Sequence, residues 1–137
     1  MAHLRDVRAL TLDAAKTMAA AAERFALERG WTVAVAVVDP AGGLILFHCL
    51  EDTQPASQEI AILKARTAAR VHRPTKALED GIAAGRAALL SLPGLVAIEG
   101  GLPIRSEGKV VGAIGVSGMT SPQDGEVAAA GLAALGL

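Results

Sequence analysis

The chain has 137 residues, of which 52% are hydrophobic and 20% are charged, and its formal net charge at pH 7 is -1. This length is usual for a single domain, so we expect one domain over residues 1–137. The near-neutral charge argues against a nucleic-acid partner, because binding to phosphates needs an excess of basic residues. An aromatic content of 2% also leaves few rings on which bases could stack.

The chain has one cysteine, Cys49, which excludes an intramolecular disulfide and a cysteine-rich zinc site. We expect this cysteine to be a small core residue. The first residues are mixed and polar, without the pattern of a secretory signal. No uncharged apolar run approaches the roughly 18 residues of a membrane span. These patterns predict a cytoplasmic protein that does not enter a membrane.

The first half of the chain predicts a helix followed by a hairpin. Apolar residues recur at intervals of three and four over residues 4–29, which indicates a helix, and Gly30 stands where a C-terminal cap belongs. Residues 32–38 are rich in valine and predict a strand covered on both faces. The turn residues 39–43 then connect it to a second strand over 44–50, as in an antiparallel hairpin.

Two helices are expected in the middle of the chain. The first covers residues 58–72, with Ser57 as a candidate N-cap. Pro74 ends it, because proline disfavours helical geometry in the residue before it. A further helix is expected over residues 75–90.

The last part of the chain predicts a second hairpin and a final helix. Residues 102–105 and 109–117 are the expected strands. Ser121 is the expected N-cap of the last helix, and Asp124 lies three residues later, where it can complete a capping box. The whole order predicts the α+β class, with an antiparallel sheet and helices packed on it.

The helix over residues 58–72 carries the most informative polar residue. Lys64 lies in line with a mainly apolar stripe, according to its helical spacing. Its aliphatic stem could pack while the ammonium reaches water. Alternatively, it is a partly buried cation that fixes a ligand carboxylate, with Thr67 as a hydroxyl partner nearby.

Basic residues concentrate around the end of the same helix, where they form either a solvated face or an anion site. The cluster consists of Lys64, Arg66, Arg70, His72, Arg73 and Lys76. The three histidines of the chain, His3, His48 and His72, do not have the spacing of a helical metal site, and a dedicated zinc site is not expected.

Four stretches of the sequence form a set of motifs: 37–43 (VVDPAGG), 62–68 (ILKARTA) with 73–75 (RPT), 100–104 (GGLPI), and 109–118 (KVVGAIGVSG) followed by 123–124 (QD). In their order and spacing, over nearly the whole chain, they resemble the GlcG/HbpS haem-binding family, which is similar to the C-terminal domain of PduO-type proteins. One stretch departs from the family pattern. Residues 49–51 read Cys-Leu-Glu where the family commonly has Arg-Met-Asp.

The resemblance implies a profilin- or PAS-like fold, with a central antiparallel sheet flanked by helices. It also implies a homo-oligomer, which the mean hydropathy of +0.42 favours independently. In several members it implies binding of haem or a related tetrapyrrole; some members are described as haem-degrading, and others occur with the catabolism of small molecules.

A haem-binding member would use the basic cluster and one histidine. We expect the carboxylates of the ligand to meet Lys64, Arg70 or Arg73, and the iron to bind His72 or His3.

Two other hypotheses stay open. The first is an enzyme that acts on a small organic acid, with Lys64 and Asp124 as polar catalytic groups. The backbone amides of Gly100 and Gly101 would then lie near the substrate oxygen. The second is an assembly subunit without catalytic activity.

Overall fold

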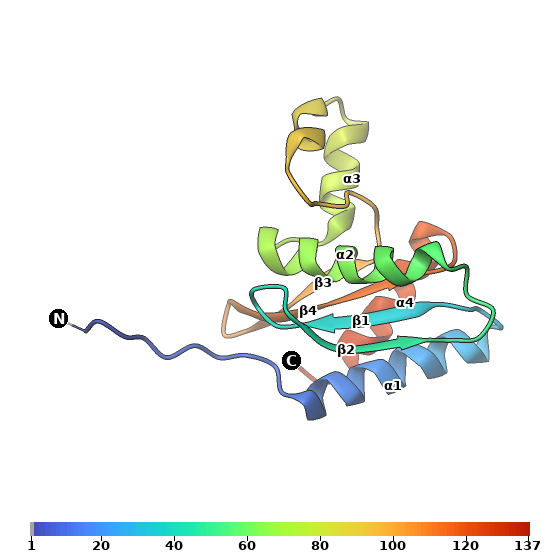
Figure 1. Cartoon of the computed structure of the whole chain (residues 1–137), viewed down its shortest axis with the longest axis horizontal. Helices are drawn as coiled ribbons and strands as arrows, with labels where there is room; N and C mark the ends of the chain where they lie inside the picture. Colours follow the sequence, from blue (N-terminus) through green and yellow to red (C-terminus); the bar gives the residue numbers. More distant parts are fainter. Residues whose placement is uncertain (1) are drawn as a thin grey trace.

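A four-stranded antiparallel sheet with helices on both faces forms the body of the protein (Figure 1). The computed structural model describes residues 2–137. The expected α+β class and the central antiparallel sheet are confirmed. The elements in chain order are α1 (Leu12–Glu28), β1 (Ala34–Val38), β2 (Leu44–Cys49), α2 (Ala56–Val71), α3 (Thr75–Ala83), the 3-10 helix η1 (Ala87–Ser91), β3 (Gly101–Ser106), β4 (Lys109–Ser117) and α4 (Ser121–Ala133).

The strand order across the sheet is β2-β1-β4-β3, and each neighbouring pair is antiparallel. Both predicted hairpins are therefore present, and the pairing of β1 with β4 joins them into one sheet. Every residue of β1 is buried, as expected for a valine-rich strand covered on both faces. β2 and β3 form the two edges of the sheet.

The two faces of the sheet are packed differently. Helices α1 and α4 cover one face, over a core of larger side chains such as Val35, Val37 and Ile114. Helix α2 covers the other face, where the contact consists largely of alanines. A Cβ atom at Gly115 of β4 would collide with the backbone of α2 at Ala61 and Ala65. The close approach of α2 to β4 therefore requires glycine at this position.

Helix α1 starts later than its apolar spacing predicts. It begins at Leu12, because the side chain of Thr11 accepts a hydrogen bond from the backbone N–H of Ala14 and forms the N-cap. Residues 2–10 are an extended segment that leads away from the body (Figure 1), and Leu4 is 91% exposed. We call residues 2–9 the arm. The apolar period over 4–10 thus belongs to this extended segment and not to a helix.

The predicted helix over 75–90 is divided in two. Helix α3 ends at Ala83, and Gly85 has a left-handed φ of +102°, which stops the helix before η1 begins. The two pieces form a projection from the body (Figure 1). Its exposed apolar side chains include Leu90 and Leu92. Such side chains could be covered by a second copy of the chain, and the homo-oligomer stays a prediction.

Cys49 is exposed, and its expected place in the core is wrong. It is the last residue of β2, an edge strand whose ends are uncovered. Ser57 is not an N-cap either. It lies inside α2, is fully buried, and its hydroxyl is bonded to that of Ser117. In the described part of the chain, no helix has the length and apolar character needed to cross a membrane.

The capping box of α4 is shifted by one residue from its predicted position. Thr120 is the N-cap and Gln123 its partner, so the predicted cap of Ser121 with Asp124 is wrong. We expect Thr120→Ala to lower the free energy of unfolding by about 0.5–2 kcal/mol, because one backbone N–H loses its acceptor. Ser121→Ala is the matched control and should leave it nearly unchanged. Urea denaturation of both variants measures this, and equal losses would contradict the assignment.

Candidate functional site

Lys64 and Asp124 form a buried ion pair at one end of the sheet. The Nζ atom of Lys64 lies 3.1 Å from Oδ2 of Asp124 and also donates to the carbonyl oxygen of Val116 at 3.0 Å. Both residues are only 2% exposed. The ammonium therefore points inward, and the expectation that it reaches water is wrong. The pair joins α2, β4 and α4.

Burial sets the protonation equilibrium of Asp124. Removal from water raises the pKa of its carboxyl group above the ordinary value, since the charged form loses solvation. The backbone N–H of Met119, which donates to Oδ1 at 2.9 Å, and the Lys64 ammonium oppose this rise. Burial is the larger influence on this pKa.

The glycines predicted to belong to the site enclose the ion pair. Gly100 has a φ of +136°, and a Cβ atom there would lie 2.8 Å from Nζ of Lys64. The N–H of Gly101 donates to the hydroxyl of Thr75 at 2.9 Å, so this amide already has a partner. The structure thus brings Lys64, Gly100, Gly101 and Asp124 together, and the charged groups of Lys64 and Asp124 bond to the protein itself.

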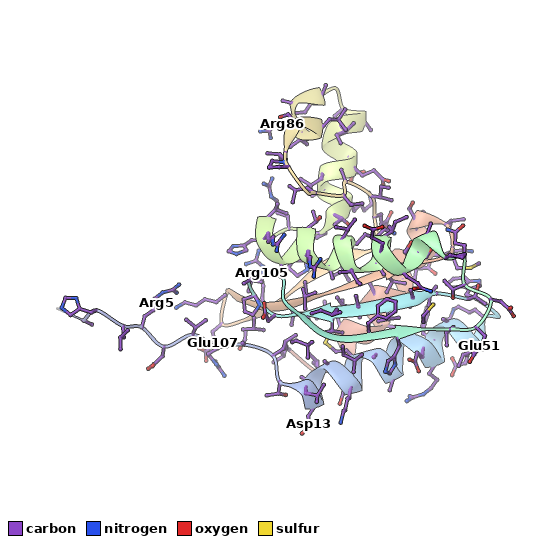
Figure 2. All side chains as sticks on the ribbon, viewed as in Figure 1. Arg5, Asp13, Glu51, Arg86, Arg105 and Glu107 are labelled. Atoms are coloured by element: carbon purple, nitrogen blue, oxygen red, sulfur yellow. The ribbon has the colours of Figure 1, made fainter. Side chains whose placement is uncertain are left out.

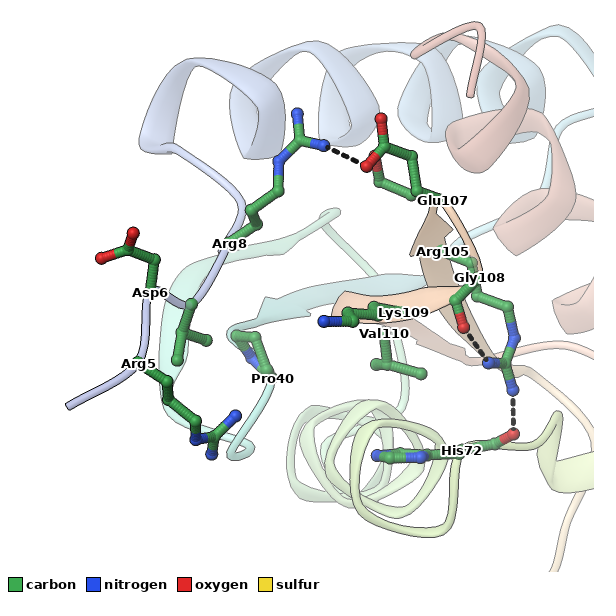
Figure 3. A pocket seen from close by; sticks show the side chains of 12 residues that line it. Arg5, Asp6, Arg8, Pro40, His72, Arg105, Glu107, Gly108, Lys109 and Val110 are labelled. Carbon is green, nitrogen blue, oxygen red and sulfur yellow. Dashed lines mark hydrogen bonds and ion pairs between the residues drawn. The ribbon is translucent and has the colours of Figure 1, made fainter. Parts of the chain in front are cut away.

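The structure also contains a cavity of about 560 Å³, on the side of the molecule where the arm lies (Figure 3). Four parts of the chain line it: residues 5–8 of the arm, residues 105–110 of the hairpin of β3 and β4, Pro40 in the turn after β1, and His72 at the end of α2. Its volume falls within the range of about 300–1,000 Å³ that is usual for small-molecule sites. Neither this cavity nor the smaller one beside Leu137 includes Lys64 or Asp124.

His72 stands where α2 ends and has a left-handed backbone, with a φ of 57°. This conformation costs a non-glycine residue about 1–2 kcal/mol. Arg105 stabilises it, because its Nη2 atom donates to the carbonyl oxygen of His72 while Nη1 donates to that of Gly108 at 3.3 Å. The two bonds hold the histidine at the rim of the cavity (Figure 3).

The cavity has more basic than acidic side chains. Arg8 pairs with Glu107 at 3.3 Å, and Arg105 is bound to backbone carbonyls. The side chains of Arg5 and Lys109 make no hydrogen bond or ion pair with any residue of 2–137, and they come from opposite walls (Figure 3). These two cations are therefore free to meet an anionic ligand.

The other predicted ligand-binding residues lie outside this cavity. The Nε atom of Arg70 donates to the carbonyl oxygen of Ala41 at 3.1 Å, and the hydroxyl of Thr67 accepts from the N–H of Val96 at 3.0 Å. Arg73 is exposed at the start of the connection to α3. His3 is exposed on the arm and does not line the cavity.

Of the cavity residues predicted from the sequence, the structure keeps only His72, and the four basic residues that the prediction missed are Arg5, Arg8, Arg105 and Lys109. The first two were assigned to the helix expected over 4–29, and the others to the strands expected over 102–105 and 109–117. A usable signal was Thr11, whose capping character predicts a later helix start and an extended arm before it.

The chemistry of the cavity fits a tetrapyrrole with an iron atom. His72 offers an imidazole nitrogen as an iron ligand, and Arg5 and Lys109 offer charges for carboxylates. Val7, Pro40 and Val110 add apolar surface for a ring. A bare metal ion fits less well, since nowhere in residues 2–137 do three or more His, Cys, Asp or Glu side chains gather as an ion would need.

Together, the sheet with its covering helices and this cavity define a small α+β domain with a cavity of the size usual for small-molecule sites. The family model described as haem degrading protein HbpS-like matches residues 10–133, and the chain belongs to this family. It is 39% identical over 108 residues to protein GlcG of Escherichia coli K12, which covers 79% of this chain and 81% of GlcG.

Two solved structures extend the likeness over nearly the whole fold. A double mutant of Streptomyces reticuli HbpS matches with a TM-score of 0.91 and 36% identity, covering 98% of this chain and 92% of that protein. A complex of PduOC with haem matches with a TM-score of 0.85 and 28% identity, covering 92% of this chain and 94% of PduOC. The resemblance found in the sequence motifs is therefore confirmed.

Proposed function

We propose that the protein binds haem or a related tetrapyrrole in the cavity beside His72. The observation that carries the proposal is the arrangement there: a histidine held at the rim by Arg105, with two unpaired cations on opposite walls. The family description and the haem complex of PduOC support this class of ligand. Haem, when bound, would supply an iron centre able to take further ligands or electrons.

In this proposal different residues bind the iron and the carboxylates of the ligand. His72 supplies the iron ligand, and Arg105 positions it through the backbone carbonyl. Arg5 and Lys109 hold the carboxylates. Lys64 was the first candidate for that role, but its ammonium is enclosed by Val116 and Asp124. We therefore assign the carboxylates to the two free cations.

A haem titration followed by absorbance tests the proposal. We expect the parent protein to give a Soret band that saturates at one haem per chain. His72→Ala should weaken binding at least about tenfold and shift the band, because the iron loses its nitrogen ligand. His48→Ala is the matched control, since this histidine pairs with Glu23 and does not line the cavity.

The same titration separates the two histidines that were proposed as iron ligands. If His3→Ala and not His72→Ala loses the band, the iron ligand is on the arm. If neither variant differs from His48→Ala, histidine ligation at this cavity is wrong. A parent protein that shows no saturable band overturns the haem proposal.

The buried ion pair favours a second candidate function, the conversion of a small organic acid. Its specific observation is the raised pKa of Asp124 beside a buried lysine, which is a common feature of catalytic sites. Both groups already bond to the protein, however, so the haem proposal ranks first. Saturable binding of a small carboxylic acid by a protein that resists haem titration would favour the enzyme.

A further inference from the structure

We infer that the arm, residues 2–9, is a strap that closes over an anionic ligand in the cavity, and that Arg5 on it selects for a ligand with a free carboxylate. The inference rests on the proposed function, because it concerns the same cavity. It adds a moving wall to that site, and it gives Arg5, which the proposed function places on the carboxylates, a role in specificity.

The arm is fixed at one end. The N–H of Leu10 donates to the carbonyl oxygen of Val111 at 2.9 Å, and the Leu10 side chain packs directly over Gly112, where a Cβ atom would collide with it. The chain is thus held to β4 immediately before α1 begins. This attachment sets the point from which the arm can move.

Beyond this point the arm has little that holds it. Its described ion pair, between Arg8 and Glu107, joins side chains that are 68% and 83% exposed, and such exposed pairs contribute little. Leu4 and Val7 are 91% and 62% exposed. Nevertheless, residues 5–8 form one whole wall of the cavity (Figure 3). A wall with so few contacts of its own can open and close.

The charges of Arg5 and Lys109 favour closure of the arm on an anionic ligand. Arg5 has no partner among residues 2–137, and Lys109 faces the cavity from the other side without a partner. Two unpaired cations on opposite walls present like charges to the cavity, and an anion bound between them would be attracted by both. A carboxylate bound there would therefore hold the arm against the body.

Limited trypsin digestion measures how accessible the arm is to the protease. The Arg8–Ala9 bond lies in the exposed arm, so we expect rapid cleavage of the free protein. Haem at saturation should slow this cleavage at least about fivefold, while cleavage in the exposed projection around Arg86 should change little. Arg86 lies far from the arm (Figure 2).

The charge selection is tested with haem and haem dimethyl ester, which lacks free carboxylates. Arg5→Gln should raise the Kd for haem about 3- to 10-fold and leave the Kd for the ester unchanged. Arg86→Gln is the matched control and should bind both ligands like the parent.

The outcomes distinguish the strap from the proposed function. Binding of haem that depends on His72, together with unprotected cleavage after Arg8 and parent-like affinity of Arg5→Gln, overturns the strap alone. A parent protein that binds no haem overturns the proposed function and the strap with it. Equal effects of Arg5→Gln on haem and on the ester overturn the carboxylate selection.

Discussion

Lys64→Met is expected to lower the free energy of unfolding by about 3–5 kcal/mol, the usual cost of removing one partner from a buried ion pair. Methionine retains the apolar stem of lysine, so packing changes little. Asp124, however, keeps a buried carboxylate with only backbone N–H groups as partners. Urea denaturation followed by circular dichroism measures the loss.

Two further variants separate the charge from the packing. Lys64→Met with Asp124→Leu removes both charges and should recover most of the lost stability, because no unpaired group remains. Lys76→Met breaks the exposed pair with Asp80 and should have a far smaller effect. If Lys64→Met is as stable as the parent, the buried pair does not hold α2 to α4.

The loss caused by Lys64→Met should also depend on pH. Burial raises the pKa of Asp124 above its ordinary value of 3.8, and loss of the lysine raises it further. The folded variant then binds more protons than the unfolded chain between that ordinary pKa and the raised one, so its stability falls as pH rises through this window. The difference between parent and variant should be larger at pH 8 than at pH 5. Equal differences would show that the carboxylate is not the cause.

Gly115→Ala is expected to cost about 3 kcal/mol or more, or to prevent folding. The new methyl group would collide with the backbone of α2 at Ala61 and Ala65, and backbone atoms cannot move aside as a flexible side chain can. Helix and sheet would have to separate along their whole contact. Thermal melting and the yield of soluble protein measure the effect.

Gly125→Ala is the matched control for this substitution. A Cβ atom at Gly125 of α4 would lie 2.7 Å from Oε2 of Glu99, the far end of a flexible side chain. Alanine also favours a helix over glycine by about 1 kcal/mol. This variant should therefore be as stable as the parent or more so. A similar loss for both variants would mean that the close contact at Gly115 is not what matters.

The strands and both hairpins were predictable from the sequence, because valine-rich runs and turn residues act locally. The first and last residues of the helices were less predictable. Thr11 ends the helical period with a side-chain cap, and Gly85 divides the helix expected over 75–90. Apolar spacing alone does not contain these effects, since a short polar or glycine residue changes the backbone without changing the period.

The candidate site was predictable only in part. Lys64 was noticeable as a charge in an apolar stripe, but its partner Asp124 lies 60 residues away in the sequence. The position of Asp124 near the start of a helix suggested a capping role instead of an ion pair. The cavity combines residues from the arm, the end of α2 and the second hairpin. The attachment of Leu10 to β4 and the packing of α2 on the sheet bring these segments together, and both are properties of the tertiary structure.

The alanine-rich contact between α2 and the sheet has a consequence for motion in the protein. Alanine loses no side-chain freedom on burial and has no alternative rotamer, so no side chain in this contact can rearrange to follow a shift of the helix. A shift of α2 would also move Ala61 and Ala65 out of their close fit over Gly115. We therefore expect α2, with His72 at its end, to move less on ligand binding than the exposed arm on the opposite wall of the cavity.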